Sequence, residues 1–180
     1  MKYETLAEIF ISMEETRARL FERVASLSPA QKSTRLNAES WTVAEIIEHL
    51  GIVEKQIVRL ATLMLAKAES AGAMASSDGR IGPVSLEGIA ERSGREKYEA
   101  PETSRPVGLP VDDSLDVMRA SREALHRLRP RLEATNLSSV DYPHPVFGPL
   151  NLYEWLVLIG LHEERHLRQI DAVLSSNNEE

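Results

Sequence analysis

WLVLIGLHEERHLRQIDAV, residues 155–173, is the stretch that decides the fold. Its large side chains recur three and four residues apart, which places them on one face of an α-helix. That face consists of Trp155, Ile159, His162, His166, Ile170 and Val173. Two histidines therefore occupy the side that an amphipathic helix buries against its neighbours, where apolar residues are the rule.

The same start signal precedes this helix and an earlier one. Two residue pairs match the capping box, Asn151 with Glu154 and Thr42 with Glu45. In this motif the side chain of each residue accepts a hydrogen bond from the backbone N–H of the other. After Thr42 an apolar face continues to about residue 68, through Ile46, Leu50, Val53, Ile57, Leu60 and Met64. His49 lies on this second face.

Two further segments have the helical period. One runs from the N-terminus to Ser28-Pro29, where proline disfavours continuation. The other starts near Asp112 or Asp113 and meets Pro130, which we expect to kink or shorten it. Strand-like alternation is not evident. Four long amphipathic helices predict an all-α fold, a four-helix bundle that forms a single domain over residues 1–180.

Residues 71–111 interrupt the helical pattern. They hold six of the nine glycines and four of the nine prolines, and so long a stretch without regular structure is unusual in a compact domain and often functional. We interpret it as a crossover between the second and third helices, with a short helix around Val84–Arg92 and with Lys97 and Tyr98 as candidate lid residues. One long link predicts up-down-down-up topology, and the shorter links predict antiparallel neighbours.

Composition excludes several classes of function. A net charge of −7 gives no electrostatic support for binding nucleic acid. The absence of cysteine excludes disulfides, thiolate metal sites and cysteine nucleophiles. No run approaches the roughly 18 apolar residues of a membrane span, and the N-terminus lacks the apolar core of a signal peptide. A soluble, cytoplasmic protein that does not act at a membrane is expected.

The three histidines on buried faces predict a metal site. His162 and His166 are one helical turn apart, with Cβ atoms roughly 5–6 Å from each other, so both can bind one ion. His49 lies roughly 10 Å from the start of its helix and His166 roughly 13 Å from the end of its own, at about 1.5 Å per residue. Because these helices are antiparallel in the predicted topology, the three imidazoles lie at similar height. A divalent transition metal is expected, Zn²⁺ or Ni²⁺ first, with Fe²⁺, Mn²⁺ and Cu²⁺ left open.

Further candidates for the pocket, or for contacts behind the histidines, are Arg17, Arg122, Glu45, Gln56 and Gln169. Both arginines interrupt apolar faces near the height of the histidines, so one of them could bind a substrate carboxylate or an acid behind a ligand. The alternative is that Thr16 or Ser121 faces inward and the arginines extend to solvent. Glu45 could accept a hydrogen bond from a ligand imidazole, although its capping role explains it better. The two glutamines border the buried faces.

Other polar residues are expected away from the site. Glu163 and Glu164 should form a solvated face with neighbouring arginines. His144 lies between two prolines, which exclude a helix there, and should lie at the opposite end of the bundle. His126 should be a surface residue. The sequence marks no general base.

SWTVAEIIEHLGIVEKQI, residues 40–57, and HPVFGPLNLYEWLVLIGLHEERHLRQI, residues 144–170, together resemble the DinB/YfiT-like superfamily of four-helix metalloenzymes, specifically its DinB-like branch. The resemblance implies a divalent metal on His49, His162 and His166, a small-molecule substrate, and often a homodimer. It implies metal-dependent hydrolysis or transfer of a low-molecular-weight thiol to an electrophile. The alternative is a non-catalytic metal-binding protein that acts in a stress response or as a scaffold.

Overall fold

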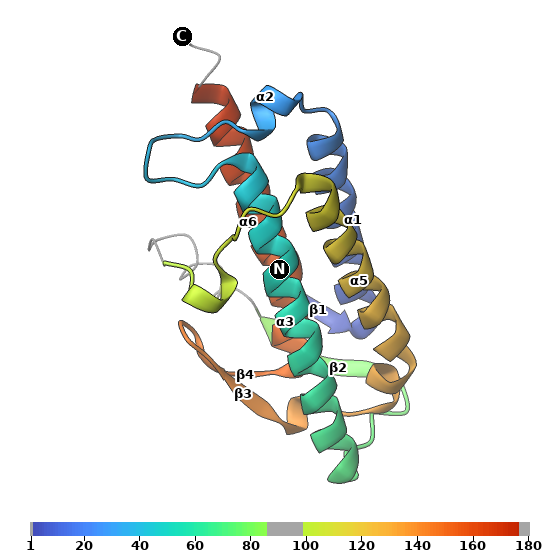
Figure 1. Cartoon of the computed structure of the whole chain (residues 1–180). Helices are drawn as coiled ribbons and strands as arrows, with labels where there is room; N and C mark the ends of the chain where they lie inside the picture. The colour runs from blue at the N-terminus through green and yellow to red at the C-terminus, as the bar shows by residue number, and fades with distance from the viewer. Residues whose placement is uncertain (1, 86–98, 177–180) are drawn as a thin grey trace.

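The computed structural model describes residues 2–85 and 99–176, and its main body is a bundle of four long helices. These are α1 (Leu6–Ala25), α3 (Val43–Ser70), α5 (Val111–Ala134) and α6 (Leu152–Ser176). In Figure 1, α1 and α6 rise toward the end that carries α2, whereas α3 and α5 descend from it. The predicted all-α bundle and its up-down-down-up topology are confirmed.

Three of the four long helices begin at side-chain caps, whereas α5 begins after Pro110 without one. Thr42 and Glu45 bond each other's backbone N–H at the start of α3, and Asn151 and Glu154 do so at the start of α6. Thr5 and Glu8 make a third such box at α1, which the sequence analysis did not identify. Pro130 does not shorten α5, which continues through it to Ala134.

The main packing partners differ from those expected. α3 packs against α5 and α6, and α1 packs against α6. The helices joined by the shorter links are therefore not the principal neighbours, because residues 26–42 and 135–151 are long enough to cross between more distant corners of a bundle. Gly51 allows α3 to approach α5 closely, since a Cβ there would lie 3.3 Å from both the Met118 side chain and the Ser114 carbonyl.

Short elements close the ends of the bundle, and they include strands for which the sequence analysis found no signal. β1 (Lys2–Thr5) pairs with β2 (Arg80–Ser85), and β3 (Asp141–His144) pairs with β4 (Gly148–Asn151), both antiparallel. Val84 and Ser85 thus lie in a strand, whereas residues 86–92 of the short helix expected there, and the lid candidates Lys97 and Tyr98, fall outside the described residues. Single turns complete the fold: α2 (Pro29–Lys32), η1 (Glu102–Ser104) and η2 (Leu137–Ser139).

The apolar core has two parts. One includes Tyr3 and Val84 and lies beside the small sheets, and the other includes Leu27 and Val43 and lies toward α2. Between them each long helix contributes one buried charged side chain to a charged layer: Arg17, Glu54, Arg122 and Glu163. Within the described residues, no helix combines the length and apolarity that a membrane crossing needs.

Candidate metal centre

The three predicted histidines converge at one point between α3 and α6. The Nε2 atom of His162 lies 3.2 Å from that of His49 and 3.0 Å from that of His166. One ring nitrogen from each residue fits within a group whose members are all within 4.8 Å of one another. The predicted agreement in height between the two helices is therefore present in the structure.

Hydrogen bonds to the outer ring nitrogens set the tautomers of two histidines. The Nδ1 of His49 lies 2.7 Å from the Ser104 carbonyl, and that of His166 lies 2.8 Å from Oε1 of Gln169. Both partners are acceptors, so each Nδ1 carries a proton and each Nε2 presents a lone pair. His162 can donate one proton from Nε2 to only one of them. At least two nitrogens therefore face each other with no proton between them, an arrangement that a bound cation resolves.

Burial keeps the imidazoles neutral, as metal ligands must be. It lowers the pKa of His49 and His162 below the ordinary value, and lowers the pKa of His166 to about 3. The positive charge of Arg165 lowers the pKa of all three further. His49 and His166 are buried, whereas part of the His162 ring faces a cavity that admits solvent.

The returning end of the crossover supplies the outer partner of His49. η1 places the Ser104 carbonyl against the imidazole, and Gln56 donates a hydrogen bond of 2.8 Å to the Thr103 carbonyl beside it. The buried carboxylate of Glu48 accepts hydrogen bonds from three consecutive backbone N–H groups, those of residues 107–109, at 2.9 to 3.0 Å. Glu48 therefore fixes the chain just beyond η1, a role that the sequence analysis did not identify.

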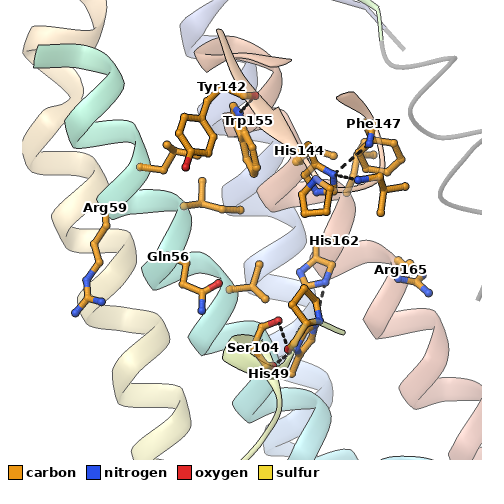
Figure 2. Close-up of a pocket in the computed structure, with 18 of the residues that line it drawn as sticks. His49, Gln56, Arg59, Ser104, Tyr142, His144, Phe147, Trp155, His162 and Arg165 are labelled. Carbon is orange, nitrogen blue, oxygen red and sulfur yellow. Dashed lines mark hydrogen bonds between the residues drawn. The ribbon is translucent and has the colours of Figure 1, made fainter. Parts of the chain in front are cut away.

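A cavity of about 570 Å³ opens beside the histidines. His49 and His162 line one end of it, and Figure 2 shows both below His144. Most of its wall is apolar and comes from α3, α6 and the β3–β4 hairpin: Val53, Ile57, Leu60, Leu63, Tyr142, Pro145, Val146, Phe147, Trp155, Leu158 and Leu161. Gln56 also lines it, as the sequence analysis allowed.

His144 lies in this cavity wall, so the expectation that it sits at the far end of the bundle is wrong. The prolines beside it do exclude a helix, but the segment folds back as the β3–β4 hairpin instead of ending the bundle. Its Nδ1 accepts hydrogen bonds from the backbone N–H groups of Val146 and Phe147, at 3.1 and 3.3 Å. The proton of neutral His144 is therefore on Nε2.

Arg17 and Arg122 are buried but do not line the cavity. Arg17 donates from Nε to Oε1 of Glu163 at 2.9 Å, and Arg122 donates from Nε to Oε1 of Glu54 at 2.8 Å. Arg17 also pairs with Glu54, and Arg122 with Glu163. The alternative in which both arginines extend to solvent is wrong.

Glu163 is 2% exposed, which contradicts the solvated face expected for it. Its Oε1 accepts from both arginines, while its Oε2 has no hydrogen-bond partner among the described residues. Burial raises the pKa of this carboxyl against the opposing effect of the two arginines. The available sequence signal was spacing, since Glu163 follows Ile159 by four residues and Glu54 follows Leu50 by four.

Gln169 supports the histidine cluster, whereas Glu45 and His126 do not take part in it. Gln169 contacts His166, as a residue behind a ligand should. Glu45 accepts hydrogen bonds from the backbone and hydroxyl of Thr42 and pairs with Arg35, and within the described part of the chain it does not bond His49, so its capping role is the one the structure supports. His126 is exposed, as expected, and bonds Glu14.

Comparison with known proteins gives one family. The model of the DinB superfamily matches residues 12–170. YuaE of Bacillus subtilis, named only as an uncharacterised protein, is 28% identical over 164 residues, which cover 88% of this chain and 93% of YuaE. OB0413 of Oceanobacillus iheyensis carries a provisional name as a metal-dependent hydrolase and is 24% identical over 176 residues, covering 97% of this chain and 88% of its own.

Two solved structures share the fold. TT2238, described as a four-helix bundle protein, superposes with a TM-score of 0.63 at 22% identity and covers 93% of this chain and 99% of its own. YfiT of Bacillus subtilis superposes with a TM-score of 0.61 at 17% identity, covering 96% of this chain and 87% of its own. YfiT is described as a probable metal-dependent hydrolase with an unusual four-helix bundle topology.

Proposed function

This chain belongs to the DinB superfamily, and from that premise we propose that it is a divalent-metal-dependent enzyme, in the first place a hydrolase of a small molecule. One observation carries the proposal: three neutral imidazoles converge through Nε2 at the end of a cavity large enough for a substrate. The names of OB0413 and YfiT agree with it. Cytoplasmic location, which the sequence pattern suggests, and a homodimer, which the family resemblance implies, are further proposals.

The donor set fits such a metal. His49, His162 and His166 would hold it through Nε2, and Ser104 and Gln169 orient two of the rings from behind. Three imidazoles without a thiolate or carboxylate would suit Zn²⁺ or Ni²⁺, and three protein ligands would leave room for a further ligand. A divalent metal there supplies a Lewis acid and lowers the pKa of water to about 7.

The protein's own groups have separate tasks. The apolar wall excludes bulk water from the bound substrate, which strengthens electrostatic interactions near the histidines. The Nε2–H group of His144 offers a hydrogen-bond donor to a substrate oxygen at the same end of the cavity. Among the described residues that line the cavity the one carboxylate is Glu99, which is exposed and pairs with Arg105.

Transfer of a low-molecular-weight thiol is the second candidate, because of this lack of a carboxylate near the histidines. Hydrolysis benefits from a base that accepts a proton from water, whereas a thiol that has already ionised attacks without one. The proposed binding of a small thiol and an electrophile in the cavity therefore remains a specific alternative. A non-catalytic metal-binding scaffold is the third possibility that an experiment must separate.

The test uses protein purified without a metal-affinity tag, stripped with a chelator and reconstituted with Zn²⁺ or Ni²⁺. Hydrolysis of aryl esters, lactones and aryl phosphates should appear on reconstitution and disappear on stripping. Turnover only with glutathione, bacillithiol or mycothiol plus an electrophile would replace the hydrolase by the thiol transferase. Metal binding without turnover on either set would overturn the enzyme proposal in favour of the scaffold.

Gln169→Ala should weaken metal binding by about 10–100-fold, the range seen when a partner behind a ligand is removed. His166 would lose the acceptor that holds its proton on Nδ1. Gln169→Glu keeps an acceptor at the same position and should retain affinity within about threefold of the wild type. The measurement is competition with a chelator of known affinity. Equal affinities for the alanine and glutamate variants would contradict the role.

A further inference from the structure

We propose that the cavity selects an amphiphilic anion, in which an apolar aromatic or alkyl body contacts the walls and a carboxylate binds Arg165 beside the histidines. The inference names the substrate class of the site and so rests on the proposed function, but the contacts that carry it do not include the metal. They are the shape and polarity of the cavity, the environment of Arg165, and the kind of polar groups that face the same space.

The walls require an apolar body. Val53, Ile57 and Leu60 of α3 face Trp155 and Leu158 of α6 across the cavity, and Phe147 closes it from the hairpin. A volume of about 570 Å³ lies within the range of roughly 300–1,000 Å³ of small-molecule sites. A compact ligand with a ring or a short alkyl chain buries apolar surface here, whereas a fully polar one would lose hydration without compensation.

Arg165 supplies an unpaired positive charge at the histidine end. It is half-buried, lines the cavity, and makes no ion pair with any carboxylate in residues 2–85 and 99–176. Two arginines of α1 that contact α6 are paired there: Arg23 with Asp171 at 2.7 Å, and Arg17 with Glu163. In Figure 2, Arg165 lies on the right of the view beyond His162, and Arg59 lies on the left.

A half-buried cation that lines an apolar cavity is incompletely solvated until an anion pairs with it. A carboxylate beside the guanidinium compensates for the lost solvation and accepts charge-assisted hydrogen bonds. The position of Arg165 therefore favours a negative head group at this end of the cavity.

The other polar groups do not offset this preference. His144 presents an Nε2–H donor, because its Nδ1 accepts from the hairpin backbone. The Gln56 amide donates to the Thr103 carbonyl. Glu99 is the acidic residue among the described lining residues, but its side chain is 91% exposed and pairs with Arg105, so solvent screens its charge. Donors thus outnumber acceptors in the part of the wall nearest the histidines.

The test compares 4-phenylbutyrate, its neutral amide 4-phenylbutyramide, and butyrate by isothermal titration calorimetry. Each is titrated into metal-free and metal-loaded full-length protein, because a metal alone also attracts carboxylates. Metal-free wild type should bind the acid about tenfold more tightly than the amide, the effect of one hydrogen bond to a charged group. Butyrate should bind more weakly than phenylbutyrate, since it lacks the apolar body.

Arg165→Gln should reduce the preference for acid over amide to about one in metal-free protein, because it removes the charge-assisted contact. Two matched variants each remove one arginine elsewhere: Arg168→Gln on the exposed face of α6, and Arg59→Gln across the cavity. Both should keep the wild-type preference. An unchanged preference in Arg165→Gln, or its loss in Arg59→Gln instead, would overturn the proposal.

Metal content, measured on the same samples by elemental analysis, separates this inference from the proposed function. Wild type that binds no divalent metal but still prefers the acid over the amide would contradict the metal enzyme and support the anion site. Wild type that binds metal and turns over neutral substrates, but shows no preference for the acid in metal-free protein, would support the metal enzyme and contradict the anion site.

Discussion

Replacing His166 by alanine is expected to abolish stoichiometric metal binding. The residue supplies one of three Nε2 atoms that converge at the end of the cavity, and its Nε2 lies 3.0 Å from that of His162. Removing a residue that hydrogen-bonds a ligand lowers metal affinity roughly 10–100-fold. Removing the ligand itself should lower it further, so we expect an affinity more than about 100-fold below that of the wild type. His49→Ala should behave alike, since it removes the ligand contributed by α3. Elemental analysis of tag-free protein, followed by titration with Zn²⁺ and Ni²⁺, measures both.

His126→Ala is the matched control, because it removes an exposed imidazole that bonds Glu14 far from the cluster. It should bind one metal ion per chain, like wild type. His144→Ala should also retain the metal, since the residue lies in the cavity wall but outside the group of converging nitrogens. Far-ultraviolet circular dichroism checks that each variant folds. A wild type that refuses both metals would contradict the site, as would full occupancy in His166→Ala.

The meeting of the three histidines was predictable because helix geometry is regular. A fixed rise of about 1.5 Å per residue converts sequence position into height, and capping boxes at Thr42 and Asn151 fix where counting starts. The topology then decides which ends coincide. No such regular geometry exists for the segments between helices, and several errors of prediction fall there.

His144 shows why. Proline on both sides excludes a helix, which the sequence analysis used correctly, but it does not say where the chain goes. Gly148, with φ of 75°, permits the turn that brings β4 back along β3 and carries His144 into the cavity wall. The sequence analysis missed the hydrogen-bond partner of His49 for another reason. The Ser104 carbonyl is a backbone group, and backbone acceptors carry no side-chain signal in a sequence.

Glu54 and Glu163 were missed because a lone carboxylate on a helix is usually solvated. Each is buried only because arginines arrive from two other helices at the same height, and the sequence analysis placed those arginines without assigning their partners. A buried ion pair depends on residues distant in sequence, so its members must be predicted together.

The second large effect is therefore expected at Glu54. Its two oxygens each pair with one arginine, Oε1 with Arg122 and Oε2 with Arg17. Glu54→Leu would leave two buried guanidinium groups sharing Glu163, with only the partly exposed Glu14 as a further partner of Arg122. The free energy of unfolding should fall by about 3–5 kcal/mol, the range for breaking one side of a buried pair. Urea denaturation measures it through the midpoint at an unchanged slope. A loss below about 1 kcal/mol would contradict the layer's stabilising role.

Glu164→Gln, on α6, provides the control at an exposed ion pair. Glu164 pairs with Arg19, whose side chain is 55% exposed, and exposed ion pairs contribute about 0–1 kcal/mol. Removing its charge should therefore change stability by no more than that amount. The comparison between Glu54 and Glu164 isolates burial, because both substitutions remove one carboxylate that an α1 arginine contacts.

A compensated variant tests whether stability alone explains the charged layer. Arg17→Met, Glu54→Leu, Arg122→Met and Glu163→Leu together remove two positive and two negative charges, so no buried charge of the layer is left unpaired. They also remove the unpartnered Oε2 of Glu163, a costly group. Replacing buried ion pairs by apolar residues is often neutral or stabilising. The free energy of unfolding of this variant should therefore lie within about 1 kcal/mol of the wild-type value or above it, in contrast to the large loss in Glu54→Leu.

The metal affinity of the compensated variant then separates two roles, because Glu163 lies between His162 and His166 on α6. Unchanged affinity would limit the layer to pairing the four helices, whereas reduced affinity at full stability would show that the layer also sets the orientation of the ligand helix.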